Sequence, residues 1–200
     1  MRPNSMRPNN MRIVGGRHRG RRLIAPPGDQ VRPTSDRARE ALFNILTHGD
    51  FASAGSPFAD ENVVDAFAGT GALGLEALSR GAARAAFIET DRAALAALRR
   101  NLAVLDEEDA ADIISGDATR PPRAPYQAAL ALLDPPYRSG LAAPALSALT
   151  QMGWLAPRAL AVVELAAKEP FSSPAGFAMI DERTYGAARL VFLRREGGTR

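Results

Sequence analysis

Hydrophobic runs alternate with amphipathic stretches along most of the chain after residue 60. The runs are short and rich in valine, isoleucine, leucine and alanine, as expected of buried strands. Between them, apolar residues recur every three or four positions, as in helices packed on one side. This pattern predicts strands at 63–64, 85–89, 113–114, 129–133 and 160–165, and helices at 72–80, 92–105 and 141–151. Such alternation favours an α/β fold with a parallel sheet covered by helices on both faces.

Both ends of the chain depart from this alternation. Residues 177–184 and 189–194 flank Tyr185-Gly186 and predict an antiparallel hairpin. Residues 12–24 predict a glycine-containing, arginine-rich hairpin that ends near Pro26. A helix should follow, with N-cap candidates at Thr34, Ser35 and Asp36, apolar positions at Ala38, Ala41, Leu42, Ile45 and Leu46, and its end at Gly49. We therefore expect three parts: a disordered extension (1–10), a basic hairpin (11–31) and the main domain (32–200).

Composition excludes several classes of protein. With 200 residues, the chain has room for one domain and a small appendage. Cysteine is absent, which excludes disulfides, zinc–thiolate sites and thiol catalysis, and we expect no metal. The start of the chain is not a secretory signal, and the longest uncharged stretch (139–157) cannot span a bilayer. We expect a cytoplasmic protein, and a monomer, because no long apolar stripe is left over.

The net charge of +3 is unevenly distributed. Residues 1–40 hold ten arginines against Asp29, Asp36 and Glu40, so this head carries +7 and the other 160 residues carry −4. A basic head on an acidic body indicates either a polyanionic partner or a solvated, disordered arm. Composition alone leaves both open.

A glycine-rich loop follows the strand at 63–64. Gly69, Gly71 and Gly74 fit the pattern G-x-G-x-x-G at a strand–turn–helix junction, and Glu89 ends the next strand at about the spacing of a ribose-binding carboxylate. The first glycine would permit the turn, the second would let a ligand approach the backbone, and the third would seat the helix on the strand. The loop predicts a nucleotide-type ligand.

Acidic residues beside this loop restrict which class of ligand can bind there. A pyrophosphate is disfavoured next to Asp65, whereas a ligand with a positive amino group, such as S-adenosylmethionine, suits it. Asp117 follows the third strand and could accept a hydrogen bond from an adenine amine. Taken alone, Asp117 is better explained as an ordinary turn aspartate.

A second motif, Asp134-Pro135-Pro136-Tyr137, follows the fourth strand at the same edge of the sheet. The prolines fix the backbone and remove two N–H donors, which leaves carbonyl oxygens facing outward. Asp134 and the Pro135 carbonyl could accept hydrogen bonds from an exocyclic amine while Tyr137 stacks on its ring. Hydrogen bonds that strengthen as the nitrogen becomes tetrahedral would stabilise the transition state of methyl transfer.

The two motifs together, DAFAGTGALG and LLDPPY, with a terminal hairpin, resemble class I S-adenosylmethionine-dependent methyltransferases that act on amines. The head, MRIVGGRHRGRRL followed by RPTSDRAREALFNIL, resembles more narrowly the bacterial family that methylates a guanine N2 amine in 16S ribosomal RNA. This similarity runs from Met11 to about Leu193. It implies a Rossmann-like fold, S-adenosylmethionine as cofactor and the small ribosomal subunit as partner.

The resemblance also implies roles for individual residues. Cofactor-binding residues would be those of the loop (Asp65, Ala66, Phe67, Gly69, Gly71, Gly74), the ribose acid Glu89, the adenine contacts Asp117 and Ala118, and Thr34 in a segment (32–37) that closes over the methionine end. Catalytic residues would be Asp134, Pro135, Pro136 and Tyr137. The arginine-rich hairpin beside such a pocket would bind RNA through Arg17, Arg19, Arg21 and Arg22.

Three further functions stay open. An adenine-N6 methyltransferase acting on DNA or RNA would use the same Asp-Pro-Pro-Tyr chemistry. A non-catalytic RNA-binding or assembly protein would keep the basic head without using the pocket. A nicotinamide-dependent dehydrogenase is the weakest alternative, because nothing in the chain supplies its substrate site.

Overall fold

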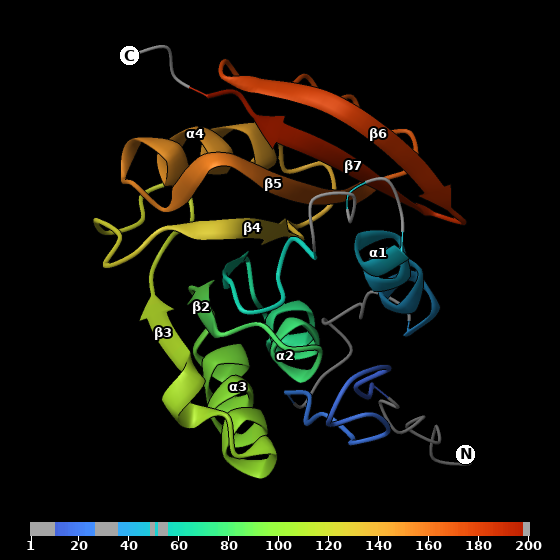
Figure 1. Cartoon of the computed structure of the whole chain (residues 1–200), viewed down its shortest axis with the longest axis vertical. Coiled ribbons are helices and arrows are strands. Elements are labelled where there is room, and N and C mark those ends of the chain that lie inside the picture. Colours follow the sequence, from blue (N-terminus) through green and yellow to red (C-terminus); the bar gives the residue numbers. More distant parts are fainter. Residues whose placement is uncertain (1–10, 27–35, 49–50, 52–55, 198–200) are drawn as a thin grey trace, which may run out of the picture.

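A seven-stranded sheet forms the centre of the computed structural model, which describes residues 11–26, 36–48, 51 and 56–197 (Figure 1). Its strands are β1 (Asn62–Ala66), β2 (Arg84–Glu89), β3 (Ala111–Ser115), β4 (Ala128–Leu133), β5 (Leu155–Ala166), β6 (Phe177–Tyr185) and β7 (Ala188–Arg195). The helices are α1 (Asp36–His48), α2 (Ala72–Ser79), α3 (Arg92–Leu105) and α4 (Ala142–Gln151), with a 3₁₀ turn, η2 (Glu108–Ala110).

The strand order β3-β2-β1-β4-β5-β7-β6 determines where a ligand can bind. The first five strands in this order are parallel, and β7 pairs antiparallel with both β5 and β6. The chain leaves β1 toward β2 on one side and later returns to place β4 on the other side. In an open parallel sheet, such a switch point creates a crevice at the carboxyl ends of the two central strands.

Helices cover both faces of the sheet, so neighbouring residues of a central strand enter different cores. Val63 packs with residues of α1, α2 and α3, whereas Val64 packs with residues of α4 and with Trp154. Figure 1 shows α4 on the opposite side of the sheet from α1 and α2. Burial on both faces explains why these strands are almost entirely apolar.

The predicted hairpin at 12–24 is present in a reduced form. Ile13 N–H donates to the Arg21 carbonyl (2.9 Å) and Leu23 N–H to the Met11 carbonyl (2.8 Å), around a single antiparallel bridge between Arg12 and Arg22. Its apolar residues Met11, Ile13 and Leu23 are buried in the same core as α1 and α2. The hairpin is therefore packed onto the main domain.

The predicted order of elements is confirmed, with most bounds within about two residues. The largest difference is β5, which begins five residues before the predicted strand at 160–165, and a register irregularity lies in the paired part of β4. Pro157 and Arg158 interrupt the apolar run in the sequence, but both are exposed. The proposed extension (1–10), the end of the hairpin unit (27–31) and the caps Thr34 and Ser35 lie outside the described residues.

No helix among the described residues is long and apolar enough to cross a membrane.

Candidate active site

A cavity of about 1110 Å³ opens at the carboxyl ends of β1, β2, β4 and β5. It brings together residues that are far apart in the sequence, including Asp65, Glu89, Asp117 and Asp134. Six carboxylates line the cavity, and none of its described lining residues is lysine, arginine or histidine. This environment suits a ligand that carries positive charge.

Asp65 lies at the floor of the cavity and is 1% exposed. Its Oδ2 accepts a hydrogen bond from the Gly74 backbone N–H (2.8 Å), so it caps the first turn of α2 from the neighbouring strand. Its Oδ1 is buried and accepts no hydrogen bond from any described residue. Burial raises the pKa of this carboxyl well above its usual value, against the lowering effect of the Gly74 hydrogen bond, and Asp134 and Glu89 raise it further. A buried acceptor without a donor is costly, and a ligand ammonium would satisfy it.

The three glycines of the loop have different environments. Gly69 lines the cavity and has no atom within 4 Å of the place where a Cβ would be. Gly71 and Gly74 lie outside the cavity lining, and a Cβ on them would lie 2.4 Å from Leu98 Cδ1 and 2.3 Å from Phe87 Cε1. The structure thus places Gly69, and not Gly71, where a ligand can approach the backbone. Gly74 has the packing position expected of it, against β2.

Glu89 ends β2 and holds the glycine loop in place. Its Oε2 accepts from the Gly69 N–H (2.8 Å), and its Oε1 accepts from the N–H groups of Thr90 (2.7 Å) and Asp91 (2.8 Å). The side chain is only partly buried and lines the cavity, so carboxylate lone pairs face a ligand there.

Asp117 and Ala118 line the same cavity on the β3 side. Asp117 Oδ1 accepts from the backbone N–H and the hydroxyl of Thr119, both at 2.8 Å, which is the local turn expected of an aspartate at this position. These bonds lower the pKa of Asp117. Ala118 is buried and gives that wall an apolar surface.

The Asp134-Pro135-Pro136-Tyr137 segment faces these groups from the end of β4. Pro135 is buried and Pro136 is exposed, so the segment lies at the rim. The Tyr137 hydroxyl donates to Glu164 Oε1 at 3.0 Å. Leu133 pairs with Val163 in the sheet, so the next residues along the two strands, Asp134 and Glu164, are neighbours.

Sequence reasoning missed Glu164, which is 5% exposed and lines the cavity. The only signal was a single carboxylate within the apolar run Ala161-Val162-Val163-Glu164-Leu165. A charged residue in a strand that is buried on both faces needs a partner or a function. The strand prediction alone could not reveal that Glu164 would lie next to Asp134.

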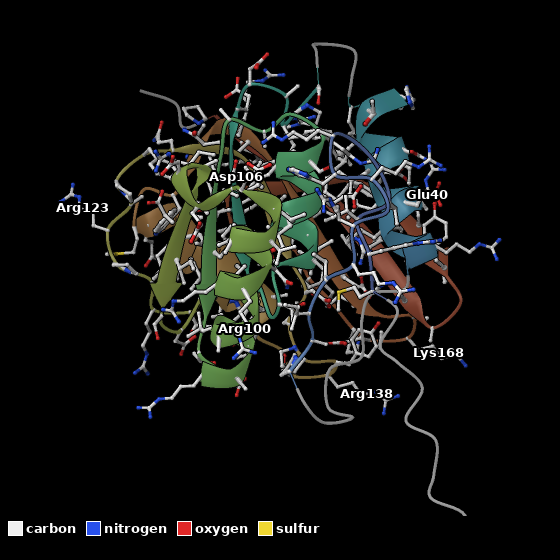
Figure 2. All side chains as sticks on the ribbon, turned by 90° about the horizontal axis from the view of Figure 1, so that it is seen from below. Glu40, Arg100, Asp106, Arg123, Arg138 and Lys168 are labelled. Carbon is white, nitrogen blue, oxygen red and sulfur yellow. The ribbon has the colours of Figure 1, made fainter. Side chains whose placement is uncertain are left out.

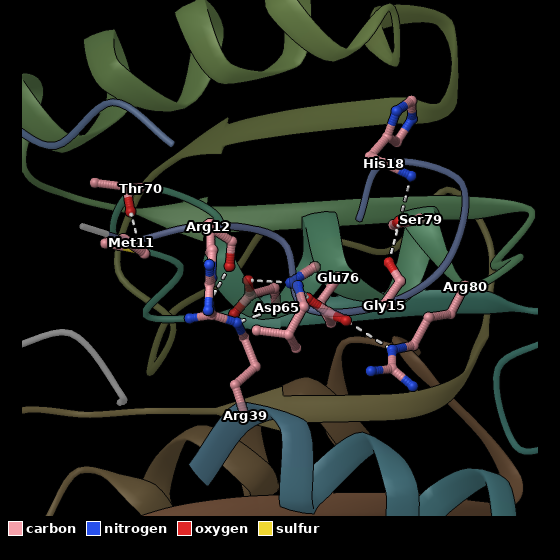
Figure 3. Close-up of polar contacts among 12 residues, drawn as sticks. Met11, Arg12, Gly15, His18, Arg39, Asp65, Thr70, Glu76, Ser79 and Arg80 are labelled. Carbon is pink, nitrogen blue, oxygen red and sulfur yellow. Dashed lines mark hydrogen bonds and ion pairs between the residues drawn. The ribbon is translucent and has the colours of Figure 1, made fainter. Parts of the chain in front are cut away.

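A buried carboxylate that sequence reasoning also missed, Glu76 on α2, connects the basic hairpin to the site (Figure 3). Its Oε2 accepts from the Val14 N–H (2.8 Å) and lies 3.7 Å from Arg39 Nε on α1; its Oε1 accepts from Arg80 Nε at 2.6 Å. Arg39 also donates to the Arg12 carbonyl. The hairpin, α1 and α2 thus share one charged cluster, and Met11 and Ala38 from two of these segments line the cavity.

The hairpin tip is fastened to the body. A Cβ on Gly16 would lie 1.9 Å from the Ser79 carbonyl oxygen, and the Arg17 N–H donates to that oxygen at 2.8 Å. The Arg17 guanidinium donates to both oxygens of Glu107 (2.8 and 2.7 Å), and His18 Nε2 lies 2.5 Å from Glu107 Oε1. Arg17, proposed from the sequence as an RNA contact, is therefore held by an acidic partner of its own chain.

The other predicted RNA contacts, Arg19, Arg21 and Arg22, are exposed. Thr34 and most of the 32–37 segment that was expected to close over the cofactor lie outside the described residues. Of the remaining cofactor candidates, Phe67 lines the cavity in a left-handed backbone conformation (φ 64°), while Ala66 is buried in the sheet.

Comparisons with known proteins identify the family of the chain. The sequence model of the family named conserved hypothetical protein 95 matches residues 11–194. Ribosomal RNA small subunit methyltransferase D of Escherichia coli K12 is 37% identical over 97% of this chain and 94% of its own length. The protein of the same name from Haemophilus influenzae is 35% identical over 88% of this chain and 89% of its own.

The solved structures that resemble this chain include methyltransferases. A protein from Escherichia coli, described as a methyltransferase, superposes with a TM-score of 0.77 at 38% identity and covers 94% of this chain and 98% of its own. An RNA methyltransferase from Salinibacter ruber, solved in complex with S-adenosyl-L-homocysteine, superposes at 0.62 with 14% identity over 84% of this chain and 96% of its own, and supports the fold alone. The chain therefore belongs to the conserved hypothetical protein 95 family, is a relative of ribosomal RNA small subunit methyltransferase D, and is an S-adenosylmethionine-dependent methyltransferase.

Proposed function

We propose that this protein transfers a methyl group from S-adenosylmethionine to the exocyclic N2 amine of a guanine in 16S ribosomal RNA. The observation that carries the proposal is the meeting of two sets of residues in one cavity. Asp65 and Glu89 belong to the first set, and Asp134 with its two prolines and Tyr137 belongs to the second. The names of the relatives support a ribosomal RNA substrate.

The residues of the first set fit the cofactor. Asp65 has a buried oxygen that lacks a donor among the described residues, which suits the ammonium of the methionine end. Glu89 offers acceptors for ribose hydroxyls, and Gly69 leaves its backbone open to close approach. When bound, S-adenosylmethionine supplies an electrophilic methyl group.

Residues of the second set would orient the amine. Its nitrogen lone pair is delocalised into the purine ring, so acceptors that favour a tetrahedral nitrogen stabilise the transition state more than the ground state. Asp134 and the Pro135 carbonyl would accept the two amine hydrogens, and the Tyr137 ring would stack on the base. Neither His18 nor His48 lines the cavity, so we expect the proton to pass to solvent after transfer.

Glu164 favours guanine over adenine as the base. Guanine presents neighbouring donors at N1–H and at its N2 amine, whereas adenine places an acceptor beside its amine. Asp134 and Glu164, on adjacent strand ends, offer only acceptors when ionised. An adenine N1 facing a carboxylate would leave two acceptors opposed, which disfavours the adenine-N6 alternative.

The small size of the protein supports an assembled subunit as its substrate. The base must be unpaired or flipped out to reach the cavity. A small enzyme with one basic hairpin has little surface for reading RNA sequence, so we propose that it acts on an assembled small subunit. Comparing methyl transfer to free 16S RNA and to subunits from a deletion strain tests this point, and equal or better transfer to free RNA would refute it.

Two measurements test the reaction itself. Mass spectrometry of ribosomal RNA nucleosides from a deletion strain should reveal the loss of N2-methylguanosine at one position; loss of N6-methyladenosine instead would establish the adenine alternative. The variant Asp134→Ala should bind S-adenosylmethionine in calorimetry yet lose methyl transfer. Normal turnover by that variant would refute the assigned role of Asp134.

A further inference from the structure

A second, smaller hollow adjoins the mouth of the active site. It measures about 480 Å³ and is lined by Tyr137, Arg138, Ala166, Ala167, Lys168 and Ala187. Two of these residues, Tyr137 and Ala187, also line the large cavity, so the hollow begins where the target base would stack. Three of the six lining residues are alanine, which leaves room for a bulky group beside the two cationic side chains.

The backbone that presents these cations is firmly held. Glu169, 7% exposed, accepts at Oε2 from the N–H groups of both Arg138 (2.8 Å) and Ala166 (3.2 Å), so one carboxylate joins the loop after β4 to the last residue of β5, where the next turn begins. The Ala167 N–H donates to the Ala187 carbonyl (2.9 Å), which fixes that turn against the β6–β7 connection. The side chains of Arg138 and Lys168 are exposed.

Arg138 has a backbone conformation that non-glycine residues rarely adopt, with φ 60°. Glycine or asparagine would be less strained here, so an arginine at this position carries a conformational cost. Lys168, across the hollow, is the only lysine in a chain with 24 arginines. Figure 2 shows both side chains at the same end of the molecule, away from Arg123.

Electrostatics indicate what these cations do. The large cavity is lined by six carboxylates, which repel a polyanion even as they hold a cationic cofactor. A nucleotide that enters this cavity brings its flanking phosphates to the rim, beside Tyr137. Cations at the rim would offset this repulsion. They would also hold the RNA backbone on either side of the flipped-out base.

We propose that Arg138 and Lys168 form a binding site for an RNA backbone phosphate next to the methylated nucleotide. The inference rests on the RNA substrate of the proposed function. It adds an anchor beside the catalytic motif, separate from the hairpin, where Arg17 is held by Glu107. Because phosphate contacts carry no sequence information, the site would position the substrate without selecting its sequence.

The test uses three variants of the full chain and small subunits from a deletion strain as substrate. Arg138→Asn removes the charge and keeps a residue that tolerates positive φ, Lys168→Ala removes the second charge, and Arg123→Ala removes a distant exposed arginine as a matched control. Steady-state transfer of labelled methyl groups is measured against subunit concentration at several salt concentrations, and cofactor affinity is measured by calorimetry.

We expect KM for the subunit to rise about 5-fold for each of the first two variants, and the slope of log affinity against log salt to fall in magnitude by about 1 for each. Cofactor affinity and all parameters of Arg123→Ala should stay at the wild-type level.

If wild-type protein methylates subunits and both variants match it, the phosphate site is refuted while the proposed function stands. Weaker cofactor binding in the variants would also overturn it, because the residues would then act by shaping the cavity. If wild-type protein methylates no RNA or subunit, the proposed function fails and this inference fails with it.

Discussion

Replacing Asp65 by asparagine should stabilise the folded protein while it weakens cofactor binding. The side chain is 1% exposed, and only one of its two oxygens accepts a hydrogen bond from a described residue. Asparagine has nearly the same shape, and its carbonyl oxygen can still accept from the Gly74 N–H. The substitution therefore removes the buried charge and leaves the cap of α2 in place.

The direction of the stability change follows from the pKa. Because burial raises the pKa of Asp65, the folded protein holds this proton more tightly than the unfolded chain does. The group therefore favours folding at low pH, and that contribution is lost as the pH rises from the unfolded-state pKa through the raised folded-state pKa. At pH 7, replacement by the neutral amide should stabilise the protein by about 1–3 kcal/mol, because the wild-type carboxyl must either bury a charge or stay protonated above its unfolded-state pKa. The gain should vanish near pH 4, where Asp65 is protonated in the folded state.

Cofactor affinity should change in the opposite sense. Loss of a charge-assisted hydrogen bond to the ligand ammonium costs about 1.5–3 kcal/mol, which corresponds to roughly a 10- to 150-fold rise in Kd. Urea denaturation at pH 7 and pH 4 measures the stability, and calorimetry with S-adenosylmethionine measures the affinity. Equal stabilisation of the variant at both pH values, or a Kd that matches the wild type, would contradict the role assigned to Asp65.

Three more predictions concern neighbouring groups. Gly74→Ala should destabilise the protein by about 1–3 kcal/mol in urea denaturation, since the new methyl group would lie 2.3 Å from Phe87 Cε1 in a filled core. Glu76→Gln should cost about 3–5 kcal/mol and increase amide hydrogen exchange in the hairpin (11–24), because buried arginine charge on α1 loses its carboxylate. Tyr137→Phe should lower kcat for methyl transfer about 5- to 10-fold and leave cofactor affinity unchanged, because the ring remains while its hydrogen bond to Glu164 is lost.

Each of these predictions has a matched control. Gly116→Ala adds a methyl group whose nearest neighbour is 3.9 Å away, so its stability should change by less than about 1 kcal/mol. Glu61→Gln removes an exposed carboxylate, and its hydrogen exchange should match that of the wild type. For Tyr137, the second variant is Tyr137→Ala. If the ring stacks on the base, kcat should fall further in Tyr137→Ala than in Tyr137→Phe. Equal losses in the two variants would argue against stacking.

The order of elements was predictable because it depends on local patterns. Strands buried on both faces are apolar throughout, and the helices between them repeat with the helical period, so both types leave a signal within a short window. The glycine loop and the Asp-Pro-Pro-Tyr motif were equally visible, since their backbone requirements restrict which residues can occupy them. The long β5 was less visible, because Pro157 and Arg158 near its start are exposed and break the apolar run.

The individual roles within the loop were less predictable. The sequence pattern assigned close ligand approach to Gly71, but its missing Cβ makes room for Leu98, and Gly69 is the glycine that lines the cavity. The contact depends on where α3 packs, and no local pattern encodes that. The same holds for Arg17, whose partner Glu107 lies ninety residues further along the chain.

The sequence by itself determined which chemistry was present: a run of alternating strands and helices, a glycine loop with spaced acids, an amine-holding motif and a basic head. Each depends on residues close together in the chain, whose spacing the backbone geometry constrains directly. Only the tertiary structure decided which distant groups meet, namely Glu164 beside Asp134, Glu76 between three segments, and two cations at the rim of an acidic cavity. These groups meet because of strand order and helix packing. Both depend on many weak contacts between residues far apart in the chain, so no local sequence pattern reveals them.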